Sequence, residues 1–271
     1  MCSSDLNYVE HTPPTLKSDL PTWVPNWSSG SSNGFAPIRH LGIPLLSRTG
    51  FICEPVTTGE RTLKVRGVVL DPVIFVSEIF NKSSTTPEMI AGLWKHIHTS
   101  FILAPYPEAN QPEAFFNTLT MTRYRGKSQA WSTAEVAYIK AMSVDTSVPG
   151  PTEYCGDGVH ASKLAVVHGL IKDRTHYMRF LVTSRGYMGL APAVAREGDM
   201  HGIIFGCEYA CILRPTEEPS HYRFLGSAFV LGSTFNQADI TGMEGFWSRL
   251  GDEYSKEWVN WDVEEQDIYL V

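Results

Sequence analysis

Apolar and polar residues alternate with the period of a β-strand in two regions of the chain. Within 51–80, Leu63 and Val65 alternate with polar neighbours, and the sequence then becomes almost continuously apolar, as expected where a strand passes from a half-exposed to a buried position. After Arg174 four more strand-like runs follow, with short turns between them: 178–184, 200–206, 208–215 and 222–232. These runs predict an antiparallel meander or a small barrel.

The middle of the chain has helical periodicity instead. Thr86, Pro87 and Glu88 suit an N-cap, a first helical residue and a first-turn acid, and the apolar residues after them share one helix face: Ile90, Leu93, Trp94 and Ile97. Similar patterns predict helices over 111–122, 131–142 and 157–173, the last with an apolar stripe of Leu164, Val167 and Ile171. The sequence therefore predicts an α+β fold, with central helices packed on an antiparallel sheet or small β-barrel built mainly from the C-terminal half plus strands around 51–80.

The first 34 residues differ in composition from the remainder. They are rich in Pro, Ser, Thr and Asn, and Trp23 and Trp27 are interleaved with prolines, which favours an extended segment that lays aromatic rings onto a surface. We expect 1–34 to be an extended tail with a tryptophan anchor and 35–271 to be a single α+β domain.

Two strand-like runs within 186–206 flank a turn-rich segment that could be mistaken for a phosphate loop. Neither the P-loop spacing nor the dinucleotide-binding spacing of glycines occurs in it. Glu197, Gly198 and Asp199 predict a tight turn in which the glycine has a positive φ and the aspartate binds local backbone amides.

Charge and composition exclude several classes of partner. The chain has 271 residues and a formal net charge of −7, so we expect no nucleic acid as a partner. Its most apolar stretch is interrupted by Asp71 and Pro72 and is too short for a membrane span. The absence of a signal-like N-terminal pattern and five scattered cysteines predict a cytoplasmic protein with free thiols.

Cofactor and metal sites are not predicted. His96 and His98 are two residues apart on a helix and point to different sides, while His160 and His168 are two helical turns apart, so neither pair suits one metal ion. Cys155 lies close in sequence to an aspartate and to His160, which leaves a thiol with a base as a weaker alternative.

Two segments combine aromatic and cationic residues of the kind that line an apolar pocket with a few orienting donors: 123–131 and 173–180. From these segments we predict Arg179, His176 and Tyr124 as catalytic hydrogen-bond donors. The predicted substrate-binding residues are Trp131, Tyr177, Tyr187, Phe229, Leu231 and Trp27.

Several stretches together resemble the region downstream of the effector domain in fungal heterokaryon-incompatibility (HET) proteins. They are LPTWVPNWSS, LKVRGVVLDPV, the run from Arg179 to Pro215, and YRFLGSAFVLG, in the same order as in that family. The resemblance covers the chain from about Leu20 to Gly232, and the effector domain itself is missing. Where the family has Glu, Tyr and His, this chain has Ser227, Phe229 and Leu231. These replacements imply either a more apolar cavity or drift in a core strand.

The resemblance implies two functions of different classes. Stand-alone chains of this kind resemble tailoring proteins of fungal secondary metabolism, among them the norbornene-forming Diels-Alderase of sordarin-type diterpene pathways. This favours a cofactor-independent cyclase or isomerase that acts on an apolar terpenoid or polyketide intermediate. The alternative is a non-catalytic interaction or regulatory module that has lost the effector. The sequence does not indicate an oligomeric state.

Overall fold

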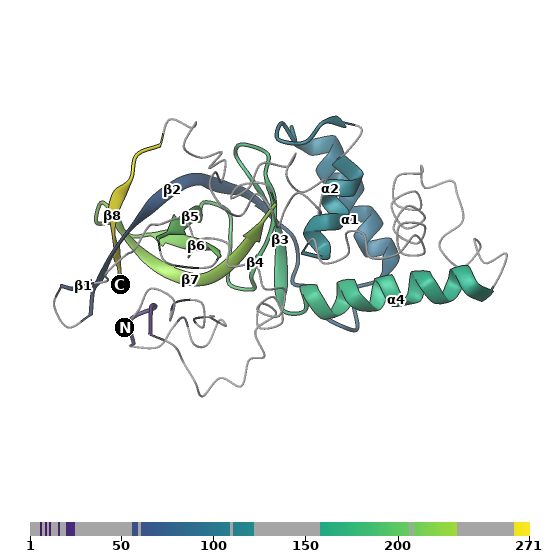
Figure 1. Ribbon diagram of the computed structural model, residues 1–271, viewed down its shortest axis with the longest axis horizontal. Helices are drawn as coiled ribbons and strands as arrows, with labels where there is room; N and C mark the ends of the chain where they lie inside the picture. The colour runs from purple at the N-terminus through teal and green to yellow at the C-terminus, as the bar shows by residue number, and fades with distance from the viewer. Residues whose placement is uncertain are drawn as a thin grey trace, which may run out of the picture.

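The computed structural model has strands gathered on one side of the molecule and helices on the other (Figure 1). The residues that it describes are 6, 9, 11, 16, 20–24, 56–58, 61–108, 111–121, 158–205, 207, 209–231 and 263–271, with backbone alone for 158–164. The described helices are α1 (Pro87–Ser100), α2 (Gln111–Leu119) and α4 (Gly158–Thr175). The helix predicted over 131–142 lies outside the described residues.

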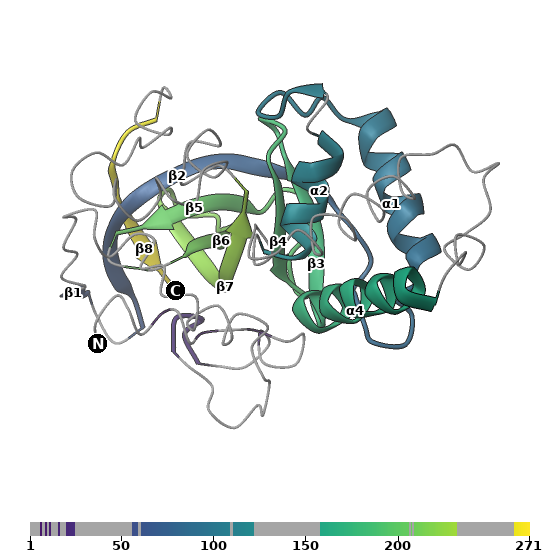
Figure 2. The ribbon, with the colours of Figure 1, turned by 45° about the vertical axis from the view of Figure 1, so that its right-hand side comes forward.

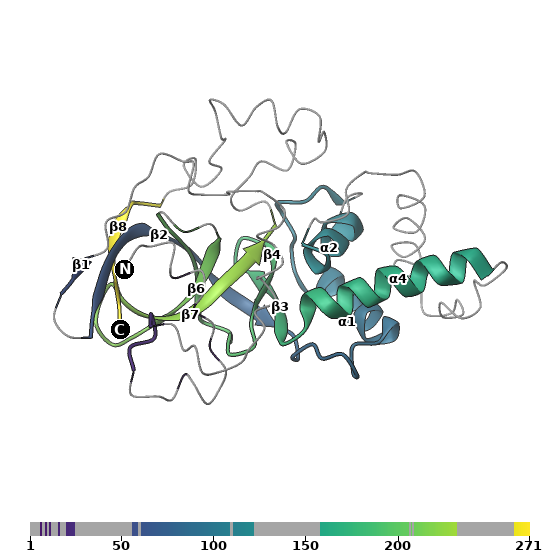
Figure 3. The ribbon, with the colours of Figure 1, turned by 60° about the horizontal axis from the view of Figure 1, so that its bottom comes forward.

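The strands belong to one eight-stranded sheet: β1 (Val56–Thr57), β2 (Leu63–Val76), β3 (Met178–Thr183), β4 (Met188–Pro192), β5 (Met200–Ile204), β6 (Ala210–Pro215), β7 (His221–Val230) and β8 (Gln266–Leu270). Their order is β1-β2-β3-β4-β7-β6-β5, and β5 pairs again with β2, so the strand pairing is ring-like. Figure 3 shows β2, β8, β6 and β7 curving around a common centre. The predicted α+β class, with a sheet from the C-terminal half and from 51–80, is confirmed.

One long, bent strand takes part in both halves of the sheet. The first half of β2 pairs with β8 and β5, and its last residues pair with β3. Its register shifts between Val69 and Asp71 and again between Val73 and Phe75. Such bulges bend a strand and increase its twist. The bend lets β2 leave the ring and lead toward the helices (Figures 1 and 2).

Two hydrophobic clusters form the core. The larger one joins the helices to β3, β4 and β7, and includes Phe115, Phe116 and Phe180, all fully buried. The smaller one lies among β2, β5, β6, β7 and β8, and Leu6 and Val9 from the N-terminal segment belong to it. Residues from the N-terminal segment and from β8 therefore pack in the same cluster.

The N-terminal segment is bonded to the opposite end of the chain. The amide of Thr22 donates to the carbonyl of Val271 (3.1 Å), and the Thr22 hydroxyl accepts from the amide of Phe224 (2.9 Å). Trp23 packs on the smaller cluster, and its indole Nε1 donates to the carbonyl of Arg61 (3.3 Å). Trp23, which was predicted to lay its ring onto a surface, therefore packs on strands of its own chain.

The cap and apolar face of α1 follow the sequence closely. The Thr86 hydroxyl accepts from the amide of Met89 (3.2 Å), and Pro87 occupies the first turn. Ile90, Trp94 and Ile97 are buried on the face that meets the larger cluster. The helix ends where Phe101 adopts an extended conformation. Both the start and the buried face of this helix were predicted, apart from Leu93, which is only partly buried.

The turn that leads into β5 has the predicted form. Gly198 has φ +85°, and the amide of Arg196 donates to Asp199 Oδ2 (2.8 Å). The sequence did not reveal the second partner of Asp199, which is the guanidinium of Arg214 in β6. The turn is therefore fixed to a neighbouring strand as well as to its own backbone.

Candidate functional site

The chain that leaves β2 runs alongside the C-terminal half of α4. The amide of Tyr177 donates to the Phe80 carbonyl (2.9 Å), Lys82 Nζ lies 3.1 Å from Asp173 Oδ1, and His168 Nε2 lies 3.1 Å from the Thr85 carbonyl. We call these two facing segments, residues 80–85 and 168–179, the α4–β3 junction. Figure 2 shows α4 extending from β3 across to α1.

A left-handed residue joins α4 to β3. The helix ends at Thr175, and Tyr177 has φ +59°, a conformation that costs a non-glycine residue about 1–2 kcal/mol. The Tyr177 side chain is 62% exposed and its ring lies 4.2 Å from that of His176, centroid to centroid. This strained connection places an aromatic pair at the surface next to buried polar groups, which is a frequent property of functional sites.

Three buried polar atoms of the junction have no hydrogen-bond partner. Among the residues that the structure describes, these atoms are Thr85 Oγ1, Arg174 Nε and His176 Nδ1. Buried polar side-chain atoms in native proteins nearly always have a partner, and an exception calls for an explanation such as strain, a catalytic role or a bound water or ion. This concentration of unpaired donors and acceptors makes the junction the candidate functional site.

Arg174 is unusual for a charged residue because only 7% of its surface is exposed. It follows Ile171 by three residues and Val167 by seven, so it continues the buried stripe of α4 toward the core. No carboxylate in the described part of the chain forms an ion pair with it. The repeat of buried positions could have indicated from the sequence that this arginine points inward.

The imidazole of His176 is kept neutral by its surroundings. Burial lowers its pKa, the nearby charge of Lys82 lowers it further, and Asp173 opposes them only in part. A neutral imidazole can donate from one nitrogen and accept at the other. Since Nδ1 is shielded from water and unpaired, it is available to a ligand that carries a complementary group.

The structure gives Arg179 a different environment from the one predicted. Its Nε donates to the carbonyl of Ala193 (2.8 Å), and one terminal nitrogen donates to the carbonyl of Ser77 (2.6 Å). These bonds tie the end of β2 to the segment after β4. Two nitrogens of Arg179, which was predicted to donate to a substrate, therefore bind backbone carbonyls. Arg174 is the arginine of this segment with an unpaired donor.

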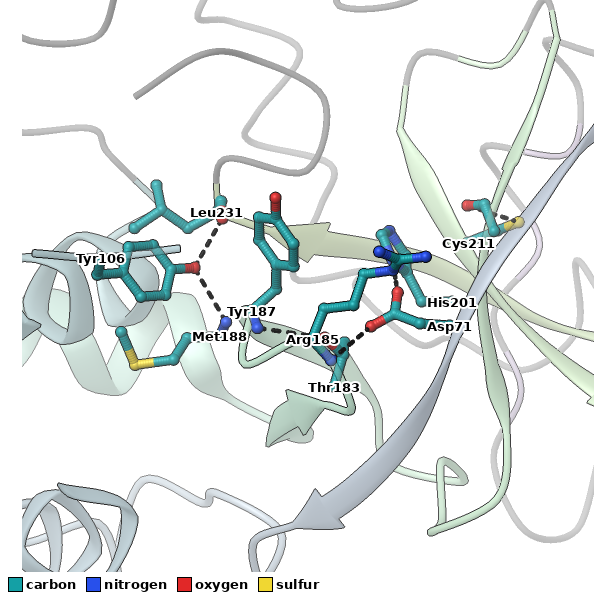
Figure 4. Close-up of polar contacts among 10 residues, drawn as sticks. Asp71, Tyr106, Thr183, Arg185, Tyr187, Met188, His201, Cys211 and Leu231 are labelled. Carbon is teal, nitrogen blue, oxygen red and sulfur yellow. Dashed lines mark hydrogen bonds and ion pairs between the residues drawn. The ribbon is translucent and has the colours of Figure 1, made fainter. Parts of the chain in front are cut away.

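The predicted substrate-binding residues fall into two groups. Tyr187 and Leu231 meet at Tyr106, whose hydroxyl donates to the Leu231 carbonyl (2.7 Å) and accepts from the amide of Met188 (3.0 Å). Phe229, partly buried, pairs with a residue of β4 in the same region. Figure 4 shows Tyr106 between Leu231 and Met188, with Tyr187 nearby.

Tyr177 and Tyr187 lie at opposite ends of the β3–β4 hairpin. Met178 pairs with Pro192 at one end and Val182 pairs with Met188 at the other. The two pairs are four residue steps apart along β3, which is roughly 13 Å at about 3.3 Å per residue. The structure therefore brings His176 and Tyr177 together, and separately Tyr187 and Leu231, but does not place both groups around one point.

Three predicted site residues cannot be placed. Tyr124, Trp131 and Trp27 lie outside the described residues, and so does Cys155 with its neighbouring aspartate. His160 is in the first turn of α4, where the structure gives the backbone alone.

The sheet contains a buried Asp–His pair that the sequence did not predict. Asp71 in β2 is opposite His201 in β5, and Asp71 Oδ1 lies 3.3 Å from His201 Nδ1 (Figure 4). Asp71 Oδ2 also accepts from the amide of Arg185 (3.2 Å). The partners are 130 residues apart, and no local pattern links them.

Hydrogen bonding decides the charge of Asp71. Burial by itself raises the pKa of this carboxyl, but the hydrogen bond and charge of His201, with bonds from Thr183 and the Arg185 amide, outweigh burial and hold the pKa below its usual range. The aspartate is therefore ionised at neutral pH. It joins the first bulge region of β2 to β5 and to the β3–β4 turn.

This pair does not form part of a catalytic triad. Cys211, on the neighbouring strand β6, has its sulfur 3.4 Å from the Gly202 carbonyl, and burial raises the pKa of the thiol far above its usual value. His201 has no exposed surface. A protonated thiol beside a fully enclosed imidazole has neither the nucleophile nor the access that acyl transfer requires.

The described ranges contain neither a metal-binding cluster nor a membrane-spanning helix. No cluster of three or more His, Cys, Asp or Glu side chains there is arranged to hold a metal ion. No helix in the same ranges is long and apolar enough to cross a membrane.

Comparison of the chain with protein-family models, with curated proteins and with solved structures finds no match. The resemblance to the HET downstream region therefore stays a prediction.

Proposed function

We propose that this chain is a cofactor-independent cyclase or isomerase that binds an apolar small molecule at the α4–β3 junction. The substrate class that fits the prediction is a terpenoid or polyketide intermediate with an oxygen-bearing group. An intramolecular Diels–Alder reaction is one such isomerisation: three π bonds become two new σ bonds and one π bond. No proton, electron or atom enters or leaves.

The observation that carries the proposal is the pair of unpaired buried nitrogens at the end of α4, Arg174 Nε and His176 Nδ1. Donors that are held in place and shielded from water stabilise developing charge on oxygen more strongly than donors in solution. A hydrogen bond to a carbonyl that activates one end of the reacting system lowers the barrier, and each 1.4 kcal/mol or so gives about a tenfold rate.

Holding the substrate in its reactive conformation would supply the remainder of the acceleration. Cyclisation within one molecule needs its two reacting ends to meet, and an enclosed apolar site favours such conformers. The larger hydrophobic cluster, to which Val167 and Ile171 belong, borders the junction and offers apolar surface.

The test is turnover of apolar terpenoid and polyketide carbonyl compounds by the purified full chain, followed by chromatography and mass spectrometry. The expected result is an isomer of unchanged mass that heat-denatured protein does not form. His176→Phe should lower the rate about 100-fold if its nitrogen binds the reacting oxygen. His96→Phe is the matched control, because His96 is an exposed histidine of α1 in contact with other aromatic rings.

The second candidate is a non-catalytic interaction module, and one observation favours it. Tyr177 is 62% exposed, and aromatic side chains are enriched at protein interfaces. The tryptophan anchor of the N-terminal segment does not support this candidate, because Trp23 packs on its own chain. Absence of turnover, together with capture of a specific protein that Tyr177→Ser abolishes, would favour the module over the enzyme.

A further inference from the structure

Arg174 carries a charge that the described structure does not compensate. A guanidinium remains protonated at any pH at which the protein is folded, so burial cannot neutralise it. A buried charge without a partner strongly opposes folding, and native proteins pair such charges or place them against a ligand.

Among the residues that the structure describes, four acidic groups have other partners. Asp173, adjacent in sequence, points to Lys82 across the junction. Asp199 is bonded through both oxygens to Arg214, and Asp71 is bonded to His201. Glu88 is held at the start of α1 by its own amide and by Thr86.

Two other arginines, Arg179 and Arg214, have guanidinium groups that are hydrogen-bonded within the protein. Arg179 donates to two backbone carbonyls, and Arg214 donates to two carboxylate oxygens and to the Val194 carbonyl. In the described part of the chain no hydrogen bond is formed by Nε of Arg174, although this arginine is more deeply buried than either. Its position on the Val167 and Ile171 stripe directs it toward apolar surface.

We propose that Arg174 is a binding residue for a carboxylate on an apolar ligand. This inference rests on the proposed function for the location of the site and adds the chemical class of the substrate, an apolar carboxylic acid. A planar guanidinium binds a carboxylate through two parallel hydrogen bonds. One negative charge balances the one uncompensated positive charge, whereas a diphosphate would leave excess negative charge in an apolar site.

The first test needs no ligand. In Arg174→Met an apolar side chain of similar length replaces the unpaired cation, so the melting temperature of the unliganded chain should rise by a few degrees. Arg223→Met, which removes an exposed arginine of β7, should leave it nearly unchanged. A fall in the melting temperature of Arg174→Met would mean that the guanidinium has a partner within the protein, and would overturn the proposal.

The second test uses a matched series of probes: farnesoic acid, its methyl ester and farnesyl diphosphate. Calorimetry on the full chain should show farnesoic acid binding at least tenfold more tightly than the ester or the diphosphate. Arg174→Met should abolish this preference and Arg223→Met should keep it. Equal binding of acid and ester, or preference for the diphosphate, would overturn the carboxylate assignment.

The two proposals can fail separately. Arg174-dependent binding of the acid without conversion of any compound would support the carboxylate site and refute the cyclase or isomerase. Isomerisation of neutral compounds at a rate that Arg174→Met leaves unchanged would support the enzyme and refute the carboxylate site.

Discussion

Arg214 binds both carboxylate oxygens of Asp199, with Nε 2.7 Å from Oδ1 and a terminal nitrogen 2.9 Å from Oδ2. Asp199 is almost completely buried, and Arg214 adds a third bond to the carbonyl of Val194. The pair therefore fixes the turn before β5 against β6.

Removing one member of this pair should be strongly destabilising. Arg214→Met leaves the enclosed Asp199 side chain without its main partner, and breaking a buried pair in this way costs about 3–5 kcal/mol. Urea unfolding followed by circular dichroism measures the loss. Asp267→Asn is the control, because its ion pair with Lys64 is exposed to water and should contribute far less. Equal effects of the two substitutions would show that the Asp199 pair is not buried in solution.

Tyr106→Phe should destabilise the protein without changing its shape. The substitution removes the hydroxyl that joins the Leu231 carbonyl to the Met188 amide, so both backbone groups lose a partner in a buried region. We expect a loss of about 1–3 kcal/mol in the free energy of unfolding. Tyr177→Phe removes an exposed hydroxyl and should change stability little; a loss as large as that of Tyr106→Phe would contradict the assignment.

Two glycines with almost the same positive φ should respond differently to alanine. Gly186 (φ +86°) and Gly198 (φ +85°) both have a left-handed backbone, but a Cβ on Gly186 would lie 2.3 Å from the Ile102 carbonyl, while one on Gly198 meets nothing within 4 Å. Gly198→Ala should cost about 1–2 kcal/mol from its conformation alone. Gly186→Ala should cost clearly more, because backbone has to move. Melting temperatures of the two variants test this order.

The contribution of Asp71 should disappear in acid. Its pKa is lower in the folded chain than the value of about 3.9 for an unfolded aspartate, so the unfolded state takes up its proton first as pH falls. The stabilisation is complete above the unfolded value and is lost as pH falls through the folded one. The difference in urea midpoint between the natural chain and Asp71→Asn should therefore be large at pH 7 and shrink below about pH 4. A constant difference would refute the role of the ionised carboxylate.

Local patterns were enough to predict most of the described elements, but not β8 or the long-range polar contacts. The alternation at Leu63 and Val65 indicated β2, and Thr86 with Pro87 indicated the start of α1. The positive φ of Gly198 also followed from the turn composition. Each of these features depends on neighbours within a few residues, which is the range over which periodicity and capping act.

The candidate site depended on contacts that the sequence does not encode locally. Arg179 was chosen as a donor because of its neighbours, yet carbonyls of Ser77 and Ala193 occupy two of its nitrogens. The Asp71–His201 pair arises only because β2 and β5 are adjacent in the sheet. Arg174 is the exception, because its spacing from Val167 and Ile171 is that of a buried position on the helix.

The pairing of β8 with β2 has a consequence for synthesis. Leu63 pairs with Leu270, and Thr22 bonds to Val271, so strands made early acquire their partners only when the last described residues have been translated. Until the ribosome releases that segment, one edge of β2 is uncovered and open to pairing with other chains. Nascent chains should therefore depend on chaperones until β8 has left the ribosome, and a stall just before residue 266 should lead to aggregation.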